Sequence, residues 1–224
     1  MGGAPYLTML LADGRLPTGA HTQSAGVEPA LAHGMRLDQV PDYLTVRLRT
    51  VTAVESAAAV VARHRWQAGS DRRTPAMVEV DAAWRVRTLS DVLRSASDSL
   101  GRSYLRTAGA VWSLDELRDH QAGVWCRAVV LGAAAAEAGL AADELARLVA
   151  YEDVQTVIAA ALKLQPFDPS RAVTWAVQAE PEVERLVAST AGLTGTEEIP
   201  AYGAPLVEEW GQRHSFATRR LFRA

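Results

Sequence analysis

Histidine and cysteine are the residue types in this chain that could bind a metal ion, and their spacing decides whether they do. Side chains that share one face of a helix lie three or four residues apart. Only His120 has an acidic residue at such a spacing, Glu116, and a predicted helix break between the two favours an ordinary surface pair. We therefore predict no metal ligands among the five histidines, which are His21, His33, His64, His120 and His214.

Nucleophilic catalysis has equally little support. Cys126 is the single cysteine, which excludes an internal disulfide and any site built from several thiolates. It lies in an apolar helical stretch, where a thiol is usually inert packing. The Gly-x-Ser-x-Gly pattern of a serine nucleophile is absent. We predict no catalytic residues, and we expect a protein that is not an enzyme and has no firmly bound cofactor.

Lysine occurs once in the chain. Lys163 is the only lysine among 23 basic residues, and it lies in the segment ALKLQ with no glycine nearby. A phosphate-binding loop needs a lysine directly after glycine to reach the terminal phosphates. Any nucleotide chemistry must therefore belong to a partner.

The composition is that of an ordinary globular protein of 224 residues, with 49% hydrophobic and 22% charged residues. The net charge of -3 argues against nucleic acid as the main partner. No uncharged apolar stretch approaches the roughly 20 residues that a membrane helix needs, so we expect no membrane span. The start MGGAPYLTMLLAD has no basic segment before its apolar run, and together with the single cysteine this indicates the cytoplasm.

Helical periodicity dominates the chain. Apolar residues recur at spacings of three and four over 38–66 and again over 143–164. Ser90, Gly139 and Asp168 have the residue types of helix ends. Further helices are expected at about 75–88, 90–112, 119–138 and 168–191. Strand-like alternation is scarce, so we predict an all-α fold, a single-domain bundle of about ten helices.

Two segments lack this periodicity, residues 14–22 and the loop 193–205, and both carry glycine and proline. The loop separates the bundle from a C-terminal tail, residues 206–224, which is expected to be extended. The tail mixes basic with apolar side chains, which are Arg213, His214, Phe216, Arg219, Arg220, Leu221, Phe222 and Arg223. This composition is typical of a segment that docks on an acidic partner and orders on binding.

Two other classes of protein share such a helical composition. A helical dimeric transcriptional regulator would carry a basic helix-turn-helix, but residues 1–40 hold only Arg15 and Arg36 against three acidic residues. A helical-bundle metal enzyme of the haem-oxygenase or di-iron kind would need inward Glu and His three residues apart, and no E-x-x-H pattern occurs. The regulator is the alternative prediction.

The segment LLADGRLPTGAHTQSAGVEPALAHG resembles the N-terminal signature of the urease accessory protein F family: a short helix, a Leu-Pro-small-Gly turn, then Ser, Gly and Glu. The matching positions are Leu16, Pro17, Thr18, Gly19, Ser24, Gly26 and Glu28. SLGRSYLR, IAAALKLQPFDPSRA and HSFATRRLFRA resemble later segments of the family in the same order. Two positions depart from its pattern. Gln23 stands where many members have a histidine, and Pro29 predicts a kink or restart of the helix after the signature.

The resemblance implies a scaffold for loading nickel into urease. Such a protein forms a homodimer, binds the accessory D or H protein, docks and modulates the nickel-carrying G-component GTPase, and presents both to apo-urease, so that nickel is handled by the complex. Arg147 and Tyr151 fall on the helix expected near the dimer contact. Lys163 falls at a position linked to GTPase coupling. The partner-binding residues indicated by the resemblance and by the tail are His21, Lys163, Arg213, His214, Arg219, Arg220, Leu221 and Phe222.

Overall fold

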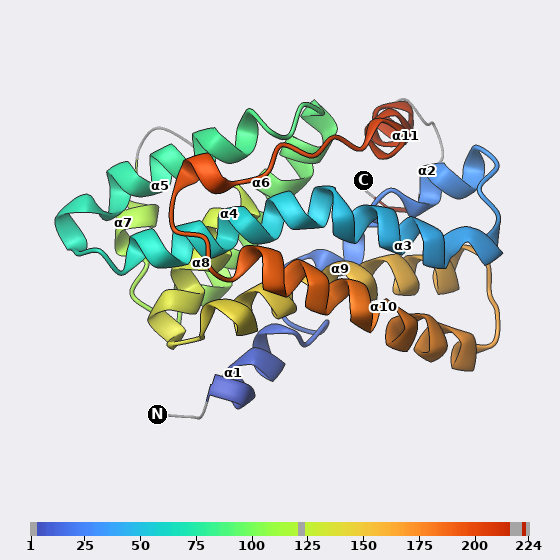
Figure 1. Ribbon diagram of the computed structural model, residues 1–224, viewed down its shortest axis with the longest axis horizontal. Coiled ribbons are helices and arrows are strands. Elements are labelled where there is room, and N and C mark those ends of the chain that lie inside the picture. Colours follow the sequence, from blue (N-terminus) through green and yellow to red (C-terminus); the bar gives the residue numbers. More distant parts are fainter. Residues whose placement is uncertain (1–3, 121–123, 216–220, 223–224) are drawn as a thin grey trace.

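The computed structural model describes residues 4–120, 124–215 and 221–222, and every regular element in these residues is a helix (Figure 1). Eleven α-helices and three short 3-10 helices occur in that part of the chain. The prediction of an all-α bundle is therefore confirmed. Among the described helices, none is both long and apolar enough to cross a membrane.

Three helices form the centre of the bundle: α4 (Val51–Trp66), α8 (Arg127–Ala138) and α9 (Ala142–Leu164). The faces at which α4 and α8 meet are buried and consist largely of alanine and valine. Small side chains let two helices approach closely. Gly132 marks a tight point, because an added Cβ there would lie 2.4 Å from the carbonyl oxygen of Ala59.

The other long helices surround this centre (Figure 1). On one side α3 (Val40–Arg49) and α10 (Pro169–Thr190) pack against each other and against α9. On the other side α5 (Ser70–Arg85) packs against α4, and α6 (Asp91–Ala108) packs against α8. The shorter elements are α1 (Ala4–Leu11), η1 (Ala20–Thr22), α2 (Val27–Ala32), η2 (Leu37–Gln39), α7 (Asp115–Arg118), η3 (Thr196–Glu198) and α11 (Pro205–Ser215).

The helix predicted over 38–66 is two helices. Thr50 has φ −125° and ψ −93°, outside the helical region, and it separates α3 from α4. The apolar residues that recur at helical spacing over this range are nevertheless buried at Val40, Leu44, Leu48, Val54, Ala58 and Val61. The break places residues 47 and 52 on different helices, and both reach the same carboxylate in the functional site described below.

Helices α9 and α10 lie almost where the sequence predicts them, and local capping residues define the start of α10 and the end of α8. The Asp168 carboxylate accepts a hydrogen bond from the Ser170 amide at 2.9 Å, as expected of a helix N-cap. Gly139 ends α8 with φ 74°, the left-handed conformation that glycine adopts most readily.

The helix predicted over 119–138 begins only at residue 127. The described residues before it, 124–126, are non-helical because they bond to other parts of the fold. The Trp125 indole donates to the Leu117 carbonyl at 2.9 Å, and the Cys126 amide donates to the Asp81 carboxylate at 2.9 Å. Tertiary hydrogen bonds here replace the helical ones.

The predicted extended tail is helical in its first half. Residues 205–215 form α11, which packs against α2 and α6. The predicted loop 193–205 is non-helical apart from η3 and its last residue, Pro205, which begins α11. Val207 is buried, and three residues later the Trp210 ring lies 6.0 Å from the Tyr43 ring. This apolar face gives the segment a reason to fold as a helix on the bundle.

The second half of the tail is described in part. Arg219 and Arg220 lie outside the described residues, and so does the side chain of His214. Leu221 and Phe222 are described, and they lie against α2, so that this end of the chain returns to the N-terminal signature (Figure 1).

Candidate functional site

The signature turn, residues 16–28, holds its shape through two glycines with left-handed backbones, Gly19 (φ 81°) and Gly26 (φ 80°). An added Cβ at Gly26 would lie 2.6 Å from the Tyr43 hydroxyl oxygen, so this position also requires the absence of a side chain. The buried members of the turn include Thr18 and Ser24, and the exposed ones include Pro17 and His21.

The two departures from the family pattern are both accommodated. Pro29 is the third residue of α2, in the first turn, where its missing N–H has no helical acceptor to lose. The predicted interruption of that helix is therefore wrong, since α2 runs through Pro29. Gln23 is 8% exposed and lines the cavity described below.

One carbonyl connects the signature turn to the bundle. The Ala25 oxygen accepts hydrogen bonds from the Tyr43 hydroxyl at 2.6 Å and from Arg47 Nη1 at 3.0 Å. Arg47 also donates to both carboxylate oxygens of Asp153, at 2.5 and 3.0 Å, and the Thr52 hydroxyl donates to the same carboxylate at 2.8 Å. The turn is thereby tied to α3, and through α3 to α4 and α9.

The Arg47–Asp153 pair is buried, with 7% and 12% of the two side chains exposed. Burial alone would raise the pKa of Asp153, but the charge and hydrogen bonds of Arg47 hold that pKa below its ordinary value. Removing one partner from such a pair would leave the other charge buried and uncompensated.

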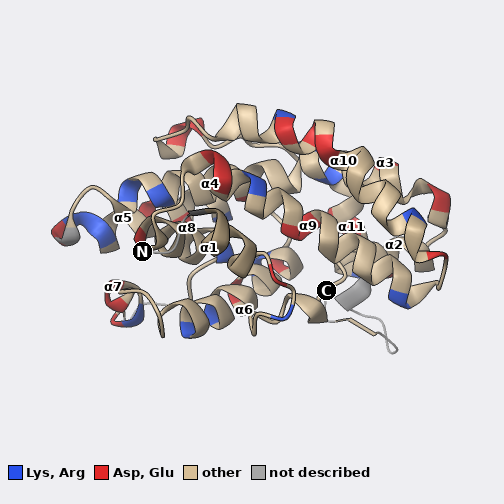
Figure 2. Ribbon diagram, turned by 90° about the horizontal axis from the view of Figure 1, so that it is seen from below, with Lys and Arg blue, Asp and Glu red and all other residues tan. Residues whose placement is uncertain are grey.

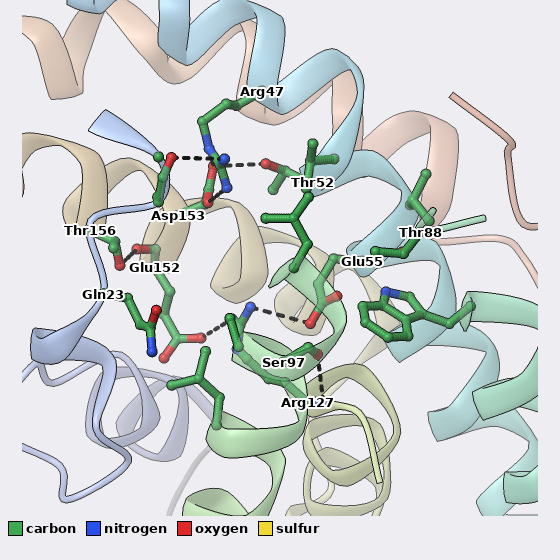
Figure 3. A pocket seen from close by; sticks show the side chains of 18 of the residues that line it. Gln23, Arg47, Thr52, Glu55, Thr88, Ser97, Arg127, Glu152, Asp153 and Thr156 are labelled. Carbon is green, nitrogen blue, oxygen red and sulfur yellow. Dashed lines mark hydrogen bonds and ion pairs between the residues drawn. The ribbon is translucent and has the colours of Figure 1, made fainter. Parts of the chain in front are cut away.

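A second buried arginine, Arg127 on α8, faces the same cavity (Figure 3). Its guanidinium lies 2.6 Å from the Glu152 carboxylate and 3.5 Å from the Glu55 carboxylate, and the Tyr104 hydroxyl donates to Glu152. Burial would lower the pKa of Arg127, but Glu152 and Glu55 raise it. Burial raises the pKa of Glu55, and Arg127 only partly opposes this effect. Arg127 therefore compensates the charge of Glu55 only in part.

These side chains line a cavity of about 140 Å³, together with apolar residues of α4, α5 and α6 (Figure 3). We call its charged members the buried charge network, which consists of Arg47, Glu55, Arg127, Glu152 and Asp153. Each arginine is already engaged by at least one carboxylate. In the described residues, no three His, Cys, Asp or Glu side chains are placed to hold a metal ion. The network therefore ties α3, α4, α8 and α9 together.

A second arrangement joins three distant segments at the surface. The Glu28 carboxylate accepts the Leu221 amide at 2.6 Å and the Phe222 amide at 2.9 Å. Phe222 is 5% exposed, and Lys163 Nζ, at the end of α9, lies 5.2 Å from the centre of its ring. We call these four residues the C-terminal clamp. It brings together one signature residue and three of the predicted partner-binding residues.

The other predicted residues lie outside this clamp. Arg213 on α11 is exposed and pairs with Glu209 at 2.6 Å. Arg147 pairs with Glu184 on α10 at 2.7 Å, and Tyr151, one turn further along α9, is 46% exposed. Tyr151 and Lys163 are separated by about 18 Å along the helix axis, at 1.5 Å per residue. The predicted dimer face and the clamp are thus different parts of the surface.

The remaining candidates for chemistry are engaged elsewhere. The Glu116 carboxylate pairs with Arg73 at 2.9 Å, whereas the His120 ring packs against Trp125 with the ring centres 4.7 Å apart. Cys126 is fully buried, and burial raises the pKa of its thiol well above the ordinary value. Burial and the raised pKa both favour the protonated thiol, and the thiolate is the nucleophilic form.

Sequence reasoning missed the buried charge network, although a signal was present. Arg47 lies within the apolar stripe of α3, Glu55 lies beside the stripe of α4, and Asp153 lies at a helical spacing from buried residues of α9. A charged residue at a buried helix position must find a partner of opposite charge. That rule could have identified the members of the network, but not their pairing.

Comparisons with known proteins identify the family of this chain. A family model described as UreF matches residues 37–180. The chain is 34% identical over 218 residues to the urease accessory protein UreF of Mycolicibacterium vanbaalenii, and 33% identical over 222 residues to that of Mycobacterium tuberculosis. Each alignment covers 96% of this chain and 96% of the relative. The chain therefore belongs to the urease accessory protein UreF family.

Proposed function

We propose that this protein is a non-catalytic scaffold in the incorporation of nickel into apo-urease. Its relatives are named urease accessory proteins, and an accessory role requires surfaces for other proteins rather than reacting groups. The charged side chains of its cavity pair with one another, which fits a structural part for them. In this proposal nickel is cargo of the whole complex, and the chain itself holds no firmly bound cofactor. The single cysteine, Cys126, is buried and cannot form an internal disulfide, which is consistent with a reducing compartment such as the cytoplasm.

The proposed partners are a second copy of the chain, the accessory D or H protein, the G-component GTPase and apo-urease. We assign the dimer contact to the face of α9 that carries Arg147 and Tyr151. We assign the other contacts to the end of the molecule that holds the C-terminal clamp, with His21 and Lys163 in the modulation of the GTPase. The observation that carries this assignment is the clamp, in which segments up to 194 positions apart meet at one surface.

Removal of residues 213–224 tests the docking role of the tail. We expect the shortened protein to keep its helical circular dichroism spectrum, because the bundle and most of α11 remain. On co-expression it should no longer co-purify with the accessory D protein. The control is Arg65→Met, which removes an ion pair between α4 and α5. This variant should co-purify with the accessory D protein as the unchanged chain does. Co-purification of the shortened protein would contradict the docking role.

The scaffold role itself is tested by urease activation. Urease co-expressed with its other accessory proteins is assayed for nickel content with and without this chain, and size-exclusion chromatography of the protein alone measures its oligomeric state. We expect the nickel content of urease to fall strongly without the chain. Equal nickel content in both cases would contradict the proposal.

A further inference from the structure

The C-terminal clamp fixes the end of the chain through its backbone. One carboxylate, that of Glu28, accepts two successive amides, at 2.6 Å from Leu221 and 2.9 Å from Phe222. Hydrogen bonds to an ionised acceptor are roughly twice as strong as neutral ones, and two of them together also set direction. The orientation of this chain segment on α2 is therefore defined by Glu28.

The two neighbouring side chains of the clamp have opposite surroundings. Phe222 is 5% exposed, whereas Leu221 is 60% exposed. The ammonium group of Lys163 lies 5.2 Å from the centre of the Phe222 ring, within the range of a cation–π interaction. A single exposed leucine is ordinary on a protein surface, but this one is held outward by a fixed backbone and an anchored neighbour.

We propose that Glu28 and Lys163 are positioning residues that hold the C-terminal segment, with Phe222 as its anchor and Leu221 as the side chain presented to a partner. The proposal rests on the docking function proposed above and divides the predicted tail residues into two roles. Lys163 acts here through the Phe222 ring, so that its influence on partner binding passes through the tail instead of a direct contact.

The chemistry of the tail indicates the kind of surface that it fits. Leucine needs an apolar recess, and the tail sequence around it supplies arginines, which bind carboxylates through a planar pair of donors. These arginines are Arg213, Arg219, Arg220 and Arg223. The partner surface is therefore an apolar recess bordered by acidic side chains, and a tail that is already positioned loses less conformational entropy on binding it.

The anchoring half of the proposal is tested on the full-length protein without any partner. Hydrogen–deuterium exchange of the C-terminal peptide reports whether the amides of residues 221 and 222 are held. Lys163→Met and Glu28→Gln should each speed this exchange by about threefold to tenfold, the factor that one contact of ordinary strength supplies. Lys163→Arg retains a cation and should exchange at the original rate. Arg65→Met, which removes one positive charge from a pair with Glu79, is the matched control.

The presenting half is tested by capture of the co-expressed accessory D protein. Leu221→Ser should leave tail exchange unchanged but weaken capture by at least about tenfold, the scale of a buried leucine contact. Phe222→Ala should change both measurements. Unchanged exchange in Lys163→Met would overturn the anchoring role, and full capture by Leu221→Ser would overturn the presenting role. If the protein without residues 213–224 also captures normally, the docking function itself has failed, while the exchange results still decide the anchoring role.

Discussion

The buried charge network and the C-terminal clamp both use a charged side chain to fix a distant part of the chain, but in opposite surroundings. In the network, Arg47 and Asp153 expose 7% and 12% of their side chains and connect two helices of the bundle. In the clamp, a carboxylate holds the end of the chain, and one of the two residues that it binds is 60% exposed.

The difference lies in what else holds each region in place. Arg127 of the network lies between two carboxylates from two other helices, so its release requires the bundle to open. The contacts that hold the segment in the clamp include two amide hydrogen bonds and one ring contact. Segments near chain ends commonly open at a lower free energy than the centre of a fold. We therefore expect the network to open only together with the whole fold, and the clamp to open at a lower free energy.

The largest decrease in the free energy of unfolding should come from a substitution that disrupts the buried charge network. Arg127→Met leaves Glu152 and Glu55 buried without their cation, and loss of one partner from a buried ion pair typically costs about 3–5 kcal/mol. We expect a decrease of that size in the free energy of unfolding, measured by urea denaturation followed by circular dichroism. Arg65→Met breaks an ion pair with Glu79 whose two side chains are 30% and 60% exposed, and it should cost less than about 1 kcal/mol. Equal decreases in the free energy of unfolding of the two variants would contradict the difference between the buried network and a surface ion pair.

In the same cavity, replacing Glu55 with glutamine should not lower the free energy of unfolding in this way. Burial raises the pKa of Glu55, so the folded protein holds this proton more tightly than the unfolded chain does. The stability that depends on the proton is complete below the ordinary pKa of 4.5 and is lost as the pH rises through the raised value. Glu55→Gln stays neutral and avoids that loss. At pH 7 its free energy of unfolding should lie within about 1 kcal/mol of the unchanged protein or above it.

The pH profile distinguishes this explanation from a simple packing effect. The difference in unfolding free energy between Glu55→Gln and the unchanged protein should grow in favour of the variant as the pH rises above 4.5. Urea denaturation at several pH values gives this difference directly. A difference that is constant with pH, or that favours the unchanged protein more at higher pH, would show that Glu55 is well compensated in the fold.

Local signals explain how much of the fold could be predicted. Helices α9 and α10 follow from their apolar stripes, the start of α10 from its N-cap Asp168 and the end of α8 from Gly139, and these signals act within a few positions of the chain. The break at Thr50 could not be predicted in this way, because the apolar spacing continues across it. Residues 124–126 are likewise set by bonds to Asp81 and Leu117, which only the assembled fold supplies.

In the candidate site, even more of the structure depends on long-range contacts that local sequence signals do not predict. The sequence predicts partner-binding residues in the signature and the tail, which stays a prediction. It does not predict the contact between Glu28 and residues 221–222, which spans more than 190 positions. No periodicity or spacing rule reaches that far. The pairing of Arg47 with Asp153 is also long-range, at 106 positions, although charges on apolar helix faces mark both residues.

The smallest effect on global stability is expected in the clamp. Glu28→Gln leaves one side-chain oxygen that can accept an amide, so one charge-assisted bond is lost at a chain end, and unfolding should change by less than about 1 kcal/mol. Urea denaturation measures this change, with Glu209→Gln on α11, an exposed carboxylate paired with Arg213, as the matched control. A loss as large as that of Arg127→Met would mean that the tail belongs to the cooperative core. The clamp would then open only together with the bundle, and the contrast between the two regions would disappear.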